Sequence, residues 1–295
     1  MTKRKLEDLN LLDDFLFSSV VNYPGIGEKF IRELLRVILG RNFGKLTVIP
    51  QKFYPGSDTD KHGARLDVYI EEDCIDNSEH DIRVYDIEPD KNIKDVTILP
   101  QRVRFYHAKI DAHCLKSGEN YQMLKKVMVI LITPYDPFGL NRMIYTIRNK
   151  CEEVPSMPYD DGAHTIFLYT KGTEGNPPEE LKQLLCYMEH TTEGNAQNDN
   201  LRNIQQMVNI VKQDKEVSLE YMKFFEREEM LIQQGRQEEQ VNTERERQQA
   251  EKEKNRAEKE KNRAEKEKNR ADQEKERADR LEEELRCLKE SLKHV

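Results

Sequence analysis

The chain has 295 residues, a formal net charge of -8 at pH 7 and a charged fraction of 35%. This length accommodates one globular domain and an extension. The segment Arg236 to Val295 contains as many basic as acidic residues, so the net negative charge belongs to residues 1 to 235. An acidic domain is not a general binder of polyanions, so any contact with nucleic acid must use a local basic strip.

Cysteine usage and hydropathy indicate the compartment. The five cysteines are scattered, and no pair has the spacing of a zinc knuckle or a CxxC motif. Reduced thiols in a cytoplasmic protein are therefore expected. The N-terminus lacks the apolar core of a signal peptide, and no apolar run approaches the roughly 18 residues that a membrane helix needs. The sequence thus predicts no membrane segment.

Two helices are expected before the first strand. Apolar residues recur near helical spacing from Leu9 to Val20, and the turn that begins at Tyr23 ends this segment. A clearer amphipathic helix follows from Ile26 to Leu39, with Gly40 as its C-terminal stop.

Strand patterns come next. KLTVIPQKFY predicts a first strand, and the runs ARLDVYI and IRVYDIEPDK flank a polar connection, which predicts a hairpin. Each hairpin strand carries a carboxylate among apolar neighbours, Asp67 in the first and Glu88 in the second. A buried acid needs a partner or a metal. Two acids on neighbouring strands could converge on Mg²⁺ or Mn²⁺, which favour carboxylate oxygens.

A helix is expected from Leu99 to Ser117, with Pro100 in its first turn. The run VMVILIT then has the continuous apolar character of a central strand that is buried on both faces. Further strands are expected at 142–148 and 165–170. GTEGNPPEEL predicts a helix with Asn176 as its cap and Pro177 at the first position.

A long helix is expected from near Leu201, and the composition changes at about Val241. Alanine then recurs every seventh residue in repeats of AEKEKNR, with Glu at the second core position of each heptad, which makes a poor coiled-coil seam. The register ends in an apolar stripe formed by Leu281, Leu285, Leu288 and Leu292. The stripe predicts a homo-oligomer through the tip of the tail, and the alternative is a solvated helix without a partner.

The ordered blocks of the chain resemble a known family. They are GARLDVYI, VYDIEPDK, RVRFYHAKIDAHCLKSGENY, VILITPYDPFG, MIYTIRNKCEE, DDGAHTIFLYTKGTEGNPPEELKQLLCYME and VSLEYMKFFEREEM. This set is similar to the recombination-promoting nuclease/putative transposase branch of the PD-(D/E)xK nuclease superfamily, roughly from Leu9 to Gly235. The resemblance implies an α/β fold with a restriction-endonuclease-like αβββαβ core and a mixed central sheet, followed by helices and a long charged coiled-coil tail. The expected domains are 1–200 (nuclease-like), 201–240 (helical extension) and 241–295 (charged heptad repeat).

The resemblance implies a metal-dependent DNA endonuclease that acts in recombination or mobile-element DNA transactions in the bacterial cytoplasm. Asp67 and Glu88 would be the ligands of Mg²⁺ or Mn²⁺. The motif usually has Lys or Gln two residues after the Glu, where this chain has Asp90. Asp90 could be a further ligand, and Lys91 or Lys94 could supply the missing cation, so Asp90 and Lys91 join the expected catalytic residues.

Three cations on the expected helix from Leu99 fit contacts with DNA phosphates: Arg102, Arg104 and Lys109. They could equally pair with the acidic surface. Asp67 also has a purely structural interpretation, as a strand carboxylate paired with Arg65 or with an arginine of that helix. The acid at position 90 favours a second hypothesis, a catalytically weakened nuclease fold that binds nucleic acid or assembles through its tail. A glycosidase-like carboxylate pair is disfavoured because tryptophan is absent.

Overall fold

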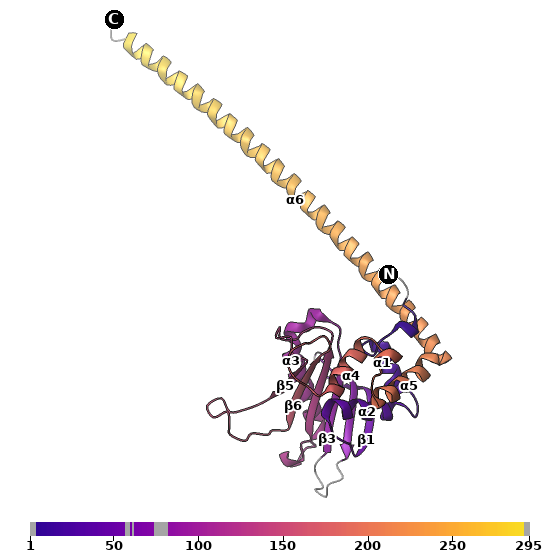
Figure 1. The fold of residues 1–295 in the computed structure, drawn as a ribbon. Helices are drawn as coiled ribbons and strands as arrows, with labels where there is room; N and C mark the ends of the chain where they lie inside the picture. Colours follow the sequence, from indigo (N-terminus) through magenta and orange to yellow (C-terminus); the bar gives the residue numbers. More distant parts are fainter. Residues whose placement is uncertain (1–3, 57–59, 61, 74–81, 292–295) are drawn as a thin grey trace. The chain divides into compact units, whose positions relative to one another are not determined.

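The computed structural model describes residues 4–56, 60, 62–73 and 82–291 (Figure 1). The chain divides into two compact units, Met1–Met222 and Lys223–Val295. The first unit is a mixed α/β unit, and the described part of the second is one continuous helix. None of the helices in the described ranges is both long and apolar enough to cross a membrane.

The described part of the first unit contains a six-stranded sheet in the order β1-β2-β3-β4-β6-β5. The strands are β1 (Lys45–Tyr54), β2 (Ala64–Asp73), β3 (Ile82–Pro89), β4 (Lys126–Thr133), β5 (Ile144–Arg148) and β6 (Ala163–Tyr169). The β1/β2, β2/β3 and β5/β6 pairs are antiparallel, whereas β3/β4 and β4/β6 are parallel. The sheet is therefore mixed, as the sequence predicted.

Helices cover both faces of this sheet. The α-helices of the described chain are α1 (Asp14–Asn22), α2 (Gly27–Leu39), α3 (Leu99–Cys114), α4 (Glu179–Glu189), α5 (Asp199–Gln213) and α6 (Lys215–Ser291). Its short 3₁₀ turns are η1 (Leu6–Asp8), η2 (Ile93–Ile98), η3 (Tyr121–Met123) and η4 (Glu193–Asn195). Helices α1, α2, α4 and α5 share one apolar core with the sheet, and α3 packs in a second core. Figure 1 shows α3 apart from that group of four. Helix α3 also provides the long crossover that the parallel strands β3 and β4 require.

Strand β3 shows how one strand serves both cores. Tyr85 and Ile87 lie in the core with α1, α2, α4 and α5, whereas Val84 packs with the buried residues of α3. Side chains alternate between the two faces of a strand. Asp86 and Glu88, which are in step with Val84, therefore lie on the α3 face.

Several predicted elements are confirmed. Strand β1 has the predicted bounds, the predicted hairpin forms from β2 and β3, and β4 is the buried central strand. Helix α2 ends at Gly40, whose φ of 65° lies in the left-handed region that favours glycine.

Some helix limits were wrong. The first α-helix starts at Asp14 rather than near Leu9, and α3 ends at Cys114 rather than Ser117. Helix α4 starts at Glu179 with Pro178 as its N-cap, so the predicted cap at Asn176 was also wrong. The reason is that a residue before proline disfavours helical backbone, which keeps Pro177 outside the helix.

The helix expected from near Leu201 is two helices. Helix α5 begins at Asp199, where the side chain of Asn198 accepts a 2.9 Å hydrogen bond from the backbone of Leu201. The chain breaks at Asp214, which has extended backbone. The Asp214 carboxylate accepts hydrogen bonds of 2.7 and 3.1 Å from backbone amides in the first turn of α6, so it starts the next helix.

The compact unit extends to Met222, beyond the predicted nuclease-like segment 1–200. The cause is that α5 and the start of α6 contribute apolar side chains to the core with α1, α2 and α4: Leu201, Ile204, Val208, Val211, Val217 and Tyr221. Burial of this kind supplies most of the stability that holds a helix onto a domain.

The second unit is helical throughout its described residues. Apart from half-buried Phe225, its side chains are exposed as far as residue 285. Ion pairs run along the helix, including Arg256 with Glu260 and Arg280 with Glu276, both at 3.7 Å. Leu281 and Leu285 are 53% and 55% exposed on this single chain. The side chain of Leu288 and all of Leu292 lie outside the described residues.

Candidate functional site

A cluster of carboxylates lies on the α3 face of the sheet. Asp86 is fully buried and Glu88 is 5% exposed. Asp67 lies on the neighbouring strand, where the β2/β3 pairing ends at Val68 opposite Ile87. The backbone amide of Asp67 donates a 2.7 Å hydrogen bond to Oε1 of Glu88. Three acids from two strands are thereby brought together, and we call Asp67, Asp86 and Glu88 the acid cluster.

Strand β2 changes face next to Asp67. Leu66 and Tyr69 both lie in the core with α3, although they are three positions apart in the strand, whereas Val68 lies in the core on the other face. The partner strand is irregular at the same level, because Gln51 has a φ of 47°. Irregularities of this kind redirect side chains and are frequent near active sites. Here the irregularity marks the position of Asp67.

Burial makes the charged state of the acid cluster unfavourable. Burial is the largest cause, and the negative charge of Asp14 the next, that together raise the pKa of Asp67 to about 6. Burial is also the main cause that raises the pKa values of Asp86 and Glu88 well above their ordinary range, and the charges of their acidic neighbours act in the same direction. Like charges at short range in a dry site cannot all ionise without a compensating cation.

Arg102 on α3 is a cation whose charge acts on every member of the acid cluster. Its positive charge lowers the pKa values of all three acids against the effect of burial. It also forms an ion pair with Asp90, whose other oxygen accepts a 2.7 Å hydrogen bond from the backbone of Asn92. Asp90 is 8% exposed, and both of its carboxylate oxygens are already bound, one by Arg102 and the other by the Asn92 amide.

The remaining predicted site residues lie elsewhere on the surface. Lys91 pairs with Asp13, which precedes α1, so its ammonium group is engaged there. Arg104 is exposed on α3. Lys109, further along α3, donates a 3.1 Å hydrogen bond to the backbone carbonyl of Pro55. The structure therefore brings together Asp67 and Glu88, places Asp90 beside them through Arg102, and directs Lys91 to Asp13.

The acid cluster has the donor chemistry of a Mg²⁺ or Mn²⁺ site. Neither carboxyl oxygen of buried Asp86 accepts a hydrogen bond from an amide, hydroxyl or cationic group of the described residues. Its interaction with the neighbouring carboxyl group of Glu88 lowers the pKa of Asp86 against the larger effect of burial. Within the same residues, no group of three or more His, Cys, Asp and Glu side chains has the geometry of a metal cage. Mg²⁺ commonly uses only one or two protein carboxylates and keeps several waters. Metal binding at the acid cluster would therefore have to use one or two of these carboxylates together with water.

Sequence reasoning missed two members of this environment. Asp86 could have been found, because the two-residue period of β3 puts it on the same face as Glu88. Asp14 gave no such signal, because the fold alone brings the start of α1 into electrostatic range of Asp67.

No protein-family model, curated protein or solved structure matches this chain. The function must therefore be argued from the residues and their geometry.

Proposed function

We propose that this protein is a metal-dependent DNA endonuclease of the PD-(D/E)xK type, with a restriction-endonuclease-like core. The observation that carries the proposal is the acid cluster, in which the Asp67 amide is hydrogen-bonded to Glu88 across adjacent strands, while the buried oxygens of Asp86 accept no hydrogen bond from an amide, hydroxyl or cationic group of the described chain. The order of helix, three strands, helix and strand in α2, β1 to β3, α3 and β4 supports the same assignment.

Asp67 and Glu88 would hold the Mg²⁺ or Mn²⁺ ion. A bound ion would neutralise the scissile phosphate and lower the pKa of an attacking water. The Asp67 amide fixes the orientation of the Glu88 carboxylate. Burial disfavours the ionised form of Asp86, so this residue would add negative charge beside the pair only once a bound cation offsets that burial. Arg102 lies beside these acids and would stabilise negative charge on the phosphate.

DNA is the proposed substrate, and its cleavage would serve recombination or mobile-element transactions in the bacterial cytoplasm. Arg104 and Lys109 lie on α3, the helix that also carries Arg102. Cations on one helix can follow a phosphate backbone while carrying no sequence information. Arg104, which is exposed on this helix, would supply a local basic contact through which an acidic domain reaches DNA.

A second candidate function is a catalytically weakened nuclease fold that binds nucleic acid or assembles through its tail. Two observations favour it. Asp90 stands where the motif has Lys or Gln, and it pairs with Arg102. Lys91, the next cation in sequence, pairs with Asp13. If neither Lys91 nor Arg102 can replace the missing lysine, the protein would bind metal and DNA without cutting.

The tail is proposed to form a coiled coil between copies of the chain. Leu281 and Leu285 are more than half exposed in the single helix, and partner helices would cover them. The charged heptads before them bury little apolar surface, so association would depend on the leucines at the tip.

The experiment that tests the enzymatic proposal is nicking of supercoiled plasmid by the full-length protein, with Mg²⁺, with Mn²⁺ and with EDTA. Cleavage that requires the divalent ion supports the nuclease. Binding of the ion and of DNA without cleavage would instead support the second candidate.

A further inference from the structure

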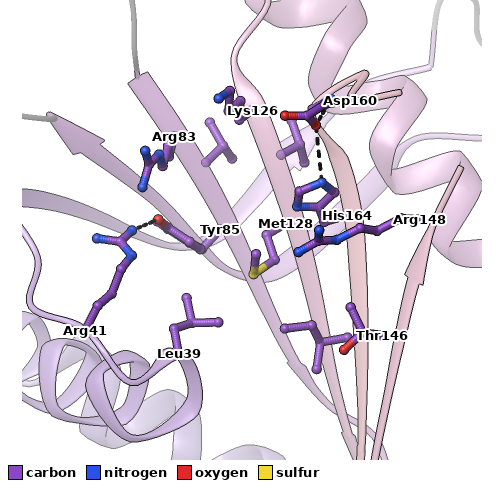
Figure 2. Close-up of a pocket in the computed structure, with 14 residues that line it drawn as sticks. Leu39, Arg41, Arg83, Tyr85, Lys126, Met128, Thr146, Arg148, Asp160 and His164 are labelled. Atoms are coloured by element: carbon purple, nitrogen blue, oxygen red, sulfur yellow. Dashed lines mark hydrogen bonds and ion pairs between the residues drawn. The ribbon is translucent and has the colours of Figure 1, made fainter. Parts of the chain in front are cut away.

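A polar cavity lies on the opposite face of the sheet from the acid cluster. Its volume is about 410 Å³. It is lined by residues at the end of α2 and by residues of strands β3, β4, β6 and β5 (Figure 2). Cavities of this size accommodate small organic ligands. Nothing in the proposed nuclease chemistry uses this cavity.

The floor of the cavity is a row of side chains across four adjacent strands. Tyr85 pairs with Met128, Met128 with His164, and His164 with Arg148. Residues opposite one another in a sheet point to the same face. Figure 2 accordingly shows these four side chains on one face of the sheet.

The next row toward the start of β3 is cationic. Arg83 and Lys126 are directly paired on β3 and β4. The following strand has Gly162 at this level, whose carbonyl accepts a 2.8 Å hydrogen bond from Val127. A Cβ atom at Gly162 would lie 3.3 Å from the Lys126 side chain. The glycine therefore leaves room beside Lys126.

Arg41 closes the cavity on the side of α2. It forms a 2.6 Å ion pair with buried Glu72, a hydrogen bond with the Tyr85 hydroxyl, and a 4.0 Å contact with the ring of Phe43. Its guanidinium is thus held in one place, and its charge is balanced by Glu72.

Positive charge exceeds negative charge among the lining side chains. Four Lys and Arg side chains line the cavity, namely Arg41, Arg83, Lys126 and Arg148. The carboxylate in the lining is Asp160, and it lies 3.4 Å from Nε2 of His164. Figure 2 shows Arg41 and Arg83 on one side of the cavity, Arg148 and His164 on the other, and Lys126 between the two sides. An anion between these two sides would be approached by cations from several strands.

We infer that this cavity binds an organic phosphate of about nucleotide size. The phosphate would lie among Arg83, Lys126 and Arg148, because arginine and lysine bind the several oxygens of a phosphate dianion through charge-assisted hydrogen bonds. The organic part would contact the apolar side chains of Leu39, Met128 and Ile166, which also line the cavity.

Calorimetric titration of the full-length protein with AMP, pyrophosphate and adenosine in EDTA tests this inference. EDTA separates the phosphate cavity from any divalent ion at the acid cluster. AMP and pyrophosphate should bind with an affinity that falls as salt is raised, and adenosine should not bind. Arg148→Gln and Arg83→Gln should each weaken AMP binding about tenfold, which corresponds to the loss of one charge-assisted hydrogen bond.

Arg202→Gln is the matched control, because Arg202 is an exposed arginine that pairs with Asp199 on α5. It should leave AMP binding unchanged, and thermal melting of each variant should confirm that the fold is retained. The inference is overturned if neither AMP nor pyrophosphate binds at millimolar concentration. It is also overturned if Arg148→Gln and Arg83→Gln bind AMP as the unmodified protein does, or if adenosine binds as well as AMP.

Discussion

The backbone amide of Asp67 is hydrogen-bonded to Oε1 of Glu88 at 2.7 Å, just beyond the last β2/β3 residue pair. This contact holds two acids of neighbouring strands together at the point where ordinary strand pairing stops. A carboxylate that accepts a backbone hydrogen bond has a fixed orientation, which a metal ligand requires. We therefore propose that Asp67 and Glu88 together bind a cation.

The first prediction concerns pH. Because the folded-state pKa of Asp67, about 6, lies above its ordinary value of 3.8, the folded protein binds this proton more tightly than the unfolded chain does. The stability contributed by the Asp67 proton is complete below pH 3.8 and is lost as the pH rises to 6. The loss is on the order of 2–3 kcal/mol in the free energy of unfolding.

Asp67→Asn removes this titration, so its stability relative to the unmodified protein should rise between pH 4 and pH 7. Urea unfolding at the two pH values in EDTA measures the difference. Asp199→Asn, which changes a fully solvated carboxylate, is the control. A constant difference between Asp67→Asn and the unmodified protein across this range would contradict the raised pKa.

The second prediction concerns Arg102. Its charge opposes the rise in the pKa of Asp67, so Arg102→Gln should raise that pKa further, as NMR titration of the carboxyl carbon would show. Arg102 also pairs with nearly buried Asp90. A double-mutant cycle of Arg102→Gln and Asp90→Asn should therefore give an interaction free energy of about 1–3 kcal/mol. A cycle that is additive would show that the ion pair does not contribute to stability.

The third prediction is that Asp90→Lys, which introduces the lysine that the motif usually has, will not increase the rate of DNA cleavage. Asp90→Lys would place an ammonium group beside Arg102 and remove the partner of that arginine. A loss of about 3 kcal/mol in stability is expected, with no gain in cleavage. Increased plasmid nicking by Asp90→Lys would instead show that the missing lysine limits the rate.

The fourth prediction concerns the tail. Deletion of residues 281–295 should shift the protein to a smaller species in analytical ultracentrifugation, because it removes the apolar stripe. The rest of the helix should keep its circular dichroism at low salt, since pairs such as Arg256 with Glu260 remain. A full-length protein that sediments as a monomer at tens of micromolar would contradict the coiled coil.

Local patterns predicted the strands well, since alternation and β-branched residues depend little on distant contacts. Strand β1 and the hairpin of β2 and β3 are examples. The break at Asp214 was missed because the side chain that ends α5 also starts α6, and it is held by the hydroxyl of Tyr23 at 2.8 Å. Helical periodicity alone continues across such a position.

Only the part of the acid cluster that depends on local strand patterns was predicted. The strand positions of Asp67 and Glu88 follow from their apolar neighbours. The pairing of Asp90 with Arg102 and the charge of Asp14 near Asp67 arise from the packing of α3 and α1 against the sheet. These contacts join residues that are far apart in the sequence, so no spacing rule reveals them.

Divalent-dependent nicking of supercoiled plasmid by Asp67→Ala, Glu88→Ala and the control Asp199→Ala tests whether Asp67 and Glu88 hold a catalytic ion. The unmodified protein and Asp199→Ala should cut with Mg²⁺ or Mn²⁺ and not with EDTA. Asp67→Ala and Glu88→Ala should each lose at least about a hundredfold in rate, because each removes a ligand of the ion, while circular dichroism shows the fold to be intact. Equal cutting by all four proteins, purified free of contaminating nuclease, would contradict the account.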